Sequence, residues 1–198
     1  MLEGLCRNTY EKILISPLLK IPAVTRCRPI AITAAACLTG ISFAPFIIAG
    51  WKWAALGALL LSGFLDTLDG SLSRFQNSAS SKGAVWDIVC DRIVEFSVLF
   101  GLYSVDRNHR GLLIIGMLGS ILLCITSFLV VGIFSENASN GIKKSFHYSP
   151  GLIERTEAFF IWGAMGLAPM AFAPLSCIFI VLVLITTAVR LWQFTQRA

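Results

Sequence analysis

The sequence predicts an all-α membrane protein, with six transmembrane helices that follow an amphipathic helix on the membrane surface. Of its 198 residues, 56% are hydrophobic and only 14% are charged, a composition outside the range of ordinary soluble domains. Several uncharged segments are long enough to cross a hydrocarbon core of about 30 Å as helices. Because no repeat, low-complexity tract or second domain is visible, residues 1–198 are expected to form one membrane domain.

The first 28 residues mix apolar and basic side chains, as an amphipathic helix on a membrane surface does. Leu5, Ile13 and Leu14 stand among Arg7 and Lys12. The segment lacks the short apolar core and small-residue cleavage site of a signal peptide. We therefore expect a juxtamembrane helix in residues 1–28.

The six spans are expected at about 30–50, 51–74, 83–105, 111–134, 155–171 and 174–192. The first and fourth segments are uncharged and long enough to be assigned as transmembrane helices without ambiguity. The second span runs into a stretch of aspartates, and the third emerges from it. The uncharged segment 158–189 is too long for one crossing, and Pro169 and Pro174 interrupt it where two helices could meet. It therefore provides the last two spans.

The basic residues predict how these spans are oriented. Six spans place both termini on one side, and only Lys52, Arg107 and Arg110 fall on the opposite side. Because cytoplasmic loops carry an excess of Lys and Arg, the termini and the aspartate stretch are expected to be cytoplasmic. This bias and anionic lipid headgroups account for the net charge of +5. No basic-aromatic run or fold signature indicates nucleic acid as a partner.

Residues 66–91 read DTLDGSLSRFQNSASSKGAVWDIVCD and contain four of the five aspartates in the chain. A carboxylate inside a span costs about 2.5 to 3.5 kcal/mol, so water, basic partners or metal cations must offset it. Asp66 and Asp69 are three residues apart, and Asp87 and Asp91 are four apart, so each pair lies on one helix face. Because consecutive spans are antiparallel, all four carboxylates can converge.

Such a group of oxygen ligands, without nearby histidines, suits two Mg²⁺ or Mn²⁺ ions. Paired divalent ions recur in enzymes of phosphoryl and related transfers. Gly70 and Gly83 permit close approach by a ligand or a neighbouring helix. The Arg74 guanidinium could reach phosphate oxygens. The stretch therefore predicts a metal-dependent site for a phosphate-containing substrate.

The spacing of these residues resembles the signature of the CDP-alcohol phosphatidyltransferases, integral membrane enzymes of phospholipid synthesis. It reads Asp66-x₂-Asp69-Gly70-x₂-Ser73-Arg74-x₈-Gly83-x₃-Asp87-x₃-Asp91. Ser73 stands where this family usually has alanine. Upstream, Pro29-Ile30-Ala31-Ile32-Thr33 is similar to the family's Pro-Asn-x-x-Thr segment, without its asparagine. The resemblance implies that the hydroxyl of a small alcohol attacks the β-phosphorus of a CDP-linked lipid such as CDP-diacylglycerol, and that CMP leaves (a transferase of EC 2.7.8 type).

The resemblance also assigns roles by position. The residues implied to hold two metal ions, Mg²⁺ or Mn²⁺, are Asp66, Asp69, Asp87 and Asp91. Asp91 is in addition the candidate general base. The residues implied to bind CDP are Gly70, Arg74 and Ser80. We further expect a homodimer in a bacterial inner membrane.

The acceptor alcohol stays open. It is expected to be glycerol 3-phosphate, inositol phosphate or another polyol phosphate, with serine, choline or ethanolamine as alternatives. Lys143, Lys144 and Arg155 lie towards the cytoplasmic face, and relatives with an anionic acceptor have a basic residue where Arg155 begins a span. Alternatively, these residues anchor the span, with Arg155 paired to Glu154 or Glu157.

Three further features of the sequence bear on the site and its function. Arg92 is expected to pair with Glu95, three residues on, rather than to contact substrate. The six cysteines are dispersed without a Cys-x-x-Cys pair, which favours a packing role. A divalent cation transporter is the alternative function of a different class, but it leaves Gly70, Arg74 and Gly83 without a role and would require acidic groups deeper in the other spans.

Overall fold

The computed structural model describes residues 11–138, 153 and 155–196, and in this part of the chain all regular elements are helices, without strands. The prediction of an all-α protein is confirmed. The helical segments in chain order are a π-helical turn Glu11–Ile15, α2 Ser16–Leu18, α3 Pro22–Thr25, α4 Pro29–Ile41, α5 Phe43–Ile48, α6 Lys52–Phe75, α7 Ser81–Val105, α8 Arg107–Ala138, α9 Arg155–Leu167, a 3₁₀ turn Pro169–Ala171 and α10 Phe172–Thr195.

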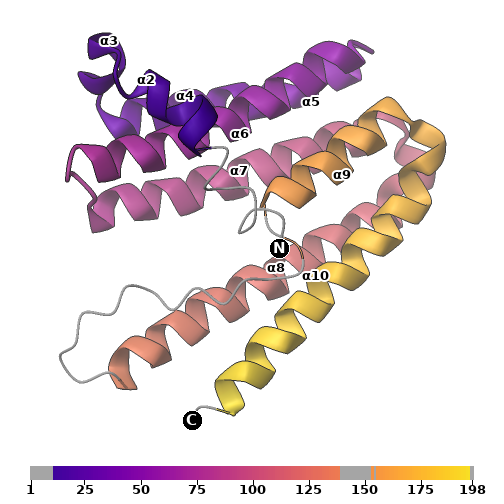
Figure 1. Ribbon diagram of the computed structural model, residues 1–198. Helices are drawn as coiled ribbons and strands as arrows, with labels where there is room; N and C mark the ends of the chain where they lie inside the picture. Colours follow the sequence, from indigo (N-terminus) through magenta and orange to yellow (C-terminus); the bar gives the residue numbers. More distant parts are fainter. Residues whose placement is uncertain (1–10, 139–152, 154, 197–198) are drawn as a thin grey trace.

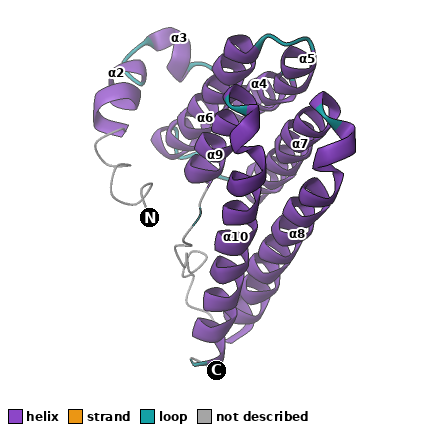
Figure 2. Cartoon of the chain, turned by 90° about the vertical axis from the view of Figure 1, so that its right-hand side faces the viewer, coloured by secondary structure: helices purple, strands orange, loops and turns teal. Residues whose placement is uncertain are grey.

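The long helices form two groups (Figures 1 and 2). In the first group, α4 packs against α6 and α7, α5 continues α4 along the same helices, and α9 packs on α6. In the second group, α8 and α10 lie side by side and diverge from the first group towards the C-terminus. The largest fully buried side chains include Trp162, Phe43 and Phe179. The core therefore joins α9 to both groups.

Four helices of the described chain are long and apolar enough to cross a membrane: Pro29–Ile48, Lys52–Phe75, Arg107–Phe134 and Pro169–Thr195. Large apolar side chains cover the outside of the molecule, with Met170 99% and Leu112 83% exposed, as lipid contact requires. The predicted count of six spans is not reached on these criteria. Helix α7 carries several charged residues, and α9 has 13 residues, which span about 20 Å at 1.5 Å per residue.

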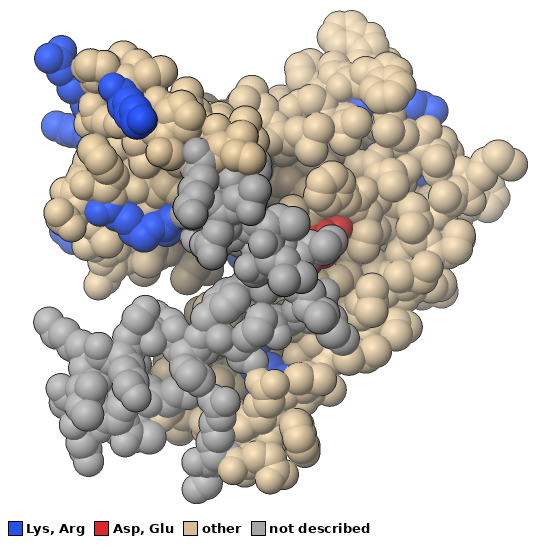
Figure 3. Space-filling view, viewed as in Figure 1, with Lys and Arg blue, Asp and Glu red and all other residues tan. Residues whose placement is uncertain are grey.

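The N-terminal segment differs from the predicted continuous helix. Residues 11–25 form three short helical pieces, and Pro17 and Pro22 lie in the first turns of the second and third, where a missing N–H is tolerated. Ile13 is 65% exposed whereas Ile15 is buried, so the segment still has two faces. Lys and Arg side chains gather over these short helices (Figure 3). Residues 1–10 of the predicted helix lie outside the described residues.

A break between two helices lies in the segment where Pro169 and Pro174 predict one, although the first helix ends before the predicted residue 171. Helix α9 ends at Leu167, and Pro169 begins the turn that leads into α10. Pro174 lies within the first turn of α10 rather than in the break. Proline is tolerated there because the first amides of a helix have no acceptor inside the helix.

Two tight turns set the directions of the central helices. Gly50, with φ +81°, precedes α6, in a left-handed conformation that glycine adopts without steric cost. Asn77, with φ +50°, lies between α6 and α7, and asparagine tolerates this region better than most residues. Ser80 caps α7, because its hydroxyl accepts a hydrogen bond from the Gly83 amide at 3.2 Å. The cap fixes the start of α7 directly after the turn.

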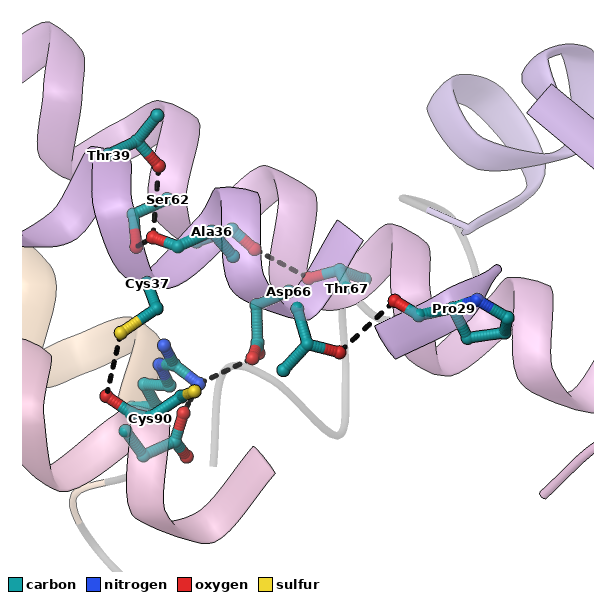
Figure 4. A network of polar contacts seen from close by, with 12 residues as sticks. Pro29, Ala36, Cys37, Thr39, Ser62, Asp66, Thr67 and Cys90 are labelled. Atoms are coloured by element: carbon teal, nitrogen blue, oxygen red, sulfur yellow. Dashed lines mark hydrogen bonds and ion pairs between the residues drawn. The ribbon is translucent and has the colours of Figure 1, made fainter. Parts of the chain in front are cut away.

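Small residues let α4 approach α6 and α7 closely. A Cβ atom added at Gly40 would lie 2.6 Å from both methyl carbons of Val94 and 2.8 Å from Ser62 Oγ. The buried Ser62 hydroxyl donates to the Ala36 carbonyl at 2.7 Å (Figure 4). Close backbone contact through small residues and interhelical hydrogen bonds is typical of helix packing in membranes.

Candidate active site

Three of the four predicted carboxylates form one group. Oxygen atoms of Asp66, Asp69 and Asp87 all lie within 4.8 Å of one another. Asp69 is buried, and the other two are half-buried. Asp69 Oδ2 and Asp87 Oδ1 are both buried without a hydrogen-bond partner. Carboxylates this close repel one another, and their unpaired oxygens are the ligands that a divalent cation prefers. The donor set therefore fits a divalent metal ion.

Asp91 lies one turn further along α7 and does not belong to this three-carboxylate group. Its carboxylate accepts a hydrogen bond from Arg155 Nη1. The same nitrogen donates to Asp66 Oδ1 at 2.6 Å (Figure 4). The Arg155 side chain is 20% exposed, and its guanidinium carbon lies 5.2 Å from the centre of the Phe159 ring. One guanidinium therefore links α9 to both acidic helices.

This arrangement bears on the alternatives that the sequence left open for Arg155. The structure pairs it with two site aspartates, whereas the sequence suggested Glu154 or Glu157 as partners. Glu154, Lys143 and Lys144 lie outside the described residues. A cation held between two site carboxylates brings phosphate-binding donors to the site itself.

A cavity of about 650 Å³ opens beside the three carboxylates. Its walls come from the linker before α4 (residues 25–28), the first turns of α4, the end of α6 and the start of α7. Asp69 and Asp87 lie in one part of the wall, and Arg26, Arg28 and Lys82 add three cations elsewhere. The size is that of a small-molecule or cofactor site. The mixture of carboxylates and cations suits a phosphate-containing ligand that carries metal ions.

The residues that the resemblance assigned to CDP meet at this cavity or at its edge. Gly70 and Ser80 line it. Among the described residues, the nearest atom to a Cβ added at Gly70 is Arg74 Nη1, at 3.6 Å, so helix packing does not demand glycine there. Arg74 is exposed, donates to Ser71 Oγ at 3.0 Å, and is not part of the cavity wall. Ser80 has a second role as the cap of α7.

Two residues of the site were not recognised from the sequence. Thr33 is buried and lines the cavity beside Asp69, and its hydroxyl donates to the Pro29 carbonyl at 3.2 Å. Its place in the Pro29–Thr33 segment is the signal that could have revealed it. Gln76 also lines the cavity and contacts the backbone of the linker before α4. It lies outside any periodic segment, so no pattern pointed to it.

The other polar predictions have clear outcomes. Arg92 Nη1 lies 2.7 Å from Glu95 Oε2, so the predicted pair is confirmed. The described cysteines are free. Cys37 is buried between α4 and α7, with its sulfur 3.9 Å from the Cys90 carbonyl oxygen (Figure 4), which agrees with a packing role.

Comparison with known proteins places this site in a family. The sequence model of the CDP-alcohol phosphatidyltransferases matches residues 26–195. Inner membrane protein YnjF of Escherichia coli is 30% identical over 176 residues, which are 87% of this chain and 84% of that protein. A phosphatidylinositol phosphate synthase of Corynebacterium glutamicum is 25% identical over 166 residues, 80% of this chain and 71% of that enzyme. The enzyme of the same name from Mycolicibacterium smegmatis is 30% identical over 152 residues, 72% and 61% of the two chains.

A solved structure has the same fold. It is the crystal structure of Mycobacterium tuberculosis phosphatidylinositol phosphate synthase (PgsA1) with CDP-DAG bound, which has a TM-score of 0.66 and 22% identity and covers 91% of this chain and 93% of that one. At this identity the likeness establishes the fold alone. The family match spans the three-carboxylate group, the cavity and Arg155. The chain therefore belongs to the CDP-alcohol phosphatidyltransferase family, as a multi-pass membrane transferase of phospholipid biosynthesis.

Proposed function

We propose that the protein transfers the phosphatidyl group of CDP-diacylglycerol to the hydroxyl of a polyol phosphate, such as inositol phosphate or glycerol 3-phosphate. The position of Arg155 carries this choice of acceptor. Its guanidinium lies between Asp66 and Asp91, and a guanidinium binds phosphate oxygens through two parallel hydrogen bonds. The two relatives named phosphatidylinositol phosphate synthases support the same class of acceptor. Choline and ethanolamine are cations that this side chain would repel.

The three-carboxylate group is the proposed metal site. Asp66, Asp69 and Asp87 would hold two divalent ions, Mg²⁺ or Mn²⁺, with Asp91 as a further ligand. The unpaired oxygens of Asp69 and Asp87 support this assignment. Bound ions would supply positive charge that stabilises the diphosphate and the departing CMP.

The cavity is the proposed site of the CDP moiety. Gly70 exposes backbone to the ligand, Ser80 offers a hydroxyl, and both line the cavity. Arg74 lies at its edge, where the exposed guanidinium could reach phosphate oxygens. The cations Arg26 and Lys82 in the cavity wall favour an anionic ligand.

Asp91 is the proposed general base. In the described state its carboxylate is occupied by the Arg155 guanidinium. An acceptor phosphate that draws Arg155 to itself would loosen this contact and bring the acceptor hydroxyl near the same carboxylate. Asp91 could then take the hydroxyl proton as the oxygen attacks the β-phosphorus. Arg155 would thus couple acceptor binding to the release of the base.

We also propose the finer points of membrane arrangement. The chain is one domain with six spans, which are the four apolar helices together with α7 and α9. The site lies on the cytoplasmic side of a bacterial inner membrane. The positive-inside rule supports this orientation. Lys143 and Lys144 would lie near the acceptor. Exposed apolar side chains on α7, such as Trp86 and Phe96, offer a surface for a homodimer.

A panel of acceptors tests the proposal. The purified protein is incubated with CDP-diacylglycerol, Mg²⁺ or Mn²⁺, and inositol phosphate, glycerol 3-phosphate, serine, choline or ethanolamine in turn. CMP and the lipid product are measured. We expect a phosphatidyl product with a phosphorylated polyol. The assigned role of Arg155 would be contradicted if product forms with serine, choline or ethanolamine but with neither inositol phosphate nor glycerol 3-phosphate.

A further inference from the structure

We propose that Gln76 is a positioning residue for the CDP-lipid cavity, because its side-chain amide fixes the linker that forms one wall. The linker, residues 25–28, runs from the last residue of α3 to the start of α4. The inference rests on the proposed function, since it takes the cavity to be the CDP-lipid site.

Gln76 follows the last residue of α6, and all parts of its amide are used. Nε2 donates to the Thr25 carbonyl at 2.8 Å and to the Cys27 carbonyl at 3.0 Å. Oε1 accepts a hydrogen bond from Ser78 Oγ at 3.3 Å. The flipped amide would turn its oxygen towards two carbonyl oxygens, so the three partners determine the orientation of the amide.

These hydrogen bonds connect the two sides of the cavity. Arg26, Cys27 and Arg28 of the linker line it on one side. Gly70 and Asp87, from α6 and α7, line it on the other. Gln76 belongs to the α6 side but holds linker carbonyls that lie 51 and 49 residues earlier in the sequence. It therefore sets the distance between the two walls.

The linker's own backbone hydrogen bonds cannot set that distance. The Arg26 amide donates to Pro22 and the Cys27 amide to Val24, which are local contacts within the end of α3. Without the Gln76 amide, the linker could adopt several positions relative to α6. Binding of the CDP-lipid would then have to order it, and ordering lowers affinity. The chemistry at Asp91 and the acceptor contact at Arg155 would be unaffected, since both residues lie outside the cavity wall.

The test measures CMP release by the full-length purified protein with CDP-diacylglycerol, Mg²⁺ and its acceptor. Wild type is compared with Gln76→Ala, Ser78→Ala and the control Gln196→Ala, which changes an exposed glutamine at the end of α10. Loss of two hydrogen bonds should raise the KM for CDP-diacylglycerol about tenfold. The kcat and the KM for the acceptor should stay within about twofold, a split that general destabilisation would not produce.

Ser78→Ala should raise the same KM by about two- to threefold, because Ser78 only orients the amide. Gln196→Ala should match wild type. A CDP-diacylglycerol KM at the wild-type value in the variants, or a loss of kcat without a change in this KM, would overturn the inference. If Gln76→Ala cannot be purified in folded form, the KM of Ser78→Ala decides. If wild type releases no CMP with any acceptor, the proposed function fails instead, and the Kd for CDP-diacylglycerol in Mg²⁺ takes the place of KM.

Discussion

Asp69→Asn should stabilise the metal-free protein, because Asp69 is the buried member of the three-carboxylate group. Two ionised carboxylates within 4.8 Å of each other repel by about 3.5 kcal/mol or more at an effective dielectric constant of about 20. Asparagine keeps the shape of the side chain and removes two of the three repulsive pairs. Proton uptake by the wild-type group limits the gain, so we expect the variant to be more stable by about 1–3 kcal/mol in chelator.

The same substitution should weaken the response to metal. A divalent ion at about 100 times its Kd stabilises a protein by about 2.7 kcal/mol, which for a chain of this size raises Tm by roughly 5–10 °C. Wild type should show a rise of this order. Asp69→Asn should show much less, because one anionic ligand is missing.

The assay is thermal unfolding of the purified protein in detergent, in chelator and over a titration of Mg²⁺ or Mn²⁺. Asp106→Asn is the matched control, because Asp106 is the one aspartate outside the stretch 66–91. A hydrogen bond with the His109 ring lowers the pKa of Asp106, and neither residue belongs to the site. The reasoning is refuted if Asp69→Asn is no more stable than wild type in chelator and keeps the wild-type rise of Tm with metal.

Three further substitutions, the last with a matched control, test other parts of the mechanism and the fold. Asp91→Asn should lower turnover by about 10² to 10⁴-fold and change the metal dependence of CMP release less than Asp69→Asn does; recovery of turnover at raised metal would make Asp91 mainly a ligand. Arg155→Lys keeps the charge but loses the bidentate geometry, so the KM of a phosphorylated acceptor should rise about tenfold while that of CDP-diacylglycerol stays constant; an unchanged acceptor KM would show that Arg155 does not bind it. Gly40→Ala should destabilise the protein by about 1–3 kcal/mol, because the new Cβ would lie 2.6 Å from the Val94 methyl carbons. Gly57→Ala has open space around the new Cβ and should leave Tm at or above the wild-type value, which thermal unfolding of both variants will decide.

Much of this site could be predicted from local sequence. The spacing of Asp66, Asp69 and Asp87 on two antiparallel helices is enough to bring their carboxylates together, since helix periodicity fixes which residues share a face. The break at Pro169 follows equally from the chemistry of one residue. The sequence predicted one helix in residues 1–28. Residues 11–25 instead form three short helical pieces, because Pro17 and Pro22 divide that segment.

The contacts between distant segments could not be predicted. Arg155 meets Asp66 and Asp91 across 89 and 64 residues of sequence. Local spacing suggested Glu154 or Glu157 as its partner. The packing of α9 on α6 brings the site aspartates within reach of the same side chain. Gln76 is a similar case, because its partners are backbone carbonyls that have no sequence signature.

The proposed function requires the three-carboxylate group to support metal-dependent transfer of a phosphatidyl group to a phosphorylated acceptor. The most direct test measures CMP and lipid product together, from CDP-diacylglycerol and the purified wild-type protein, with and without acceptor and divalent metal. We predict equal amounts of CMP and phosphatidyl-polyol phosphate when acceptor and metal are both present, and neither product in excess chelator. Undiminished CMP release in excess chelator, or CMP release matched by phosphatidic acid instead of the phosphatidyl acceptor, would contradict the proposed function.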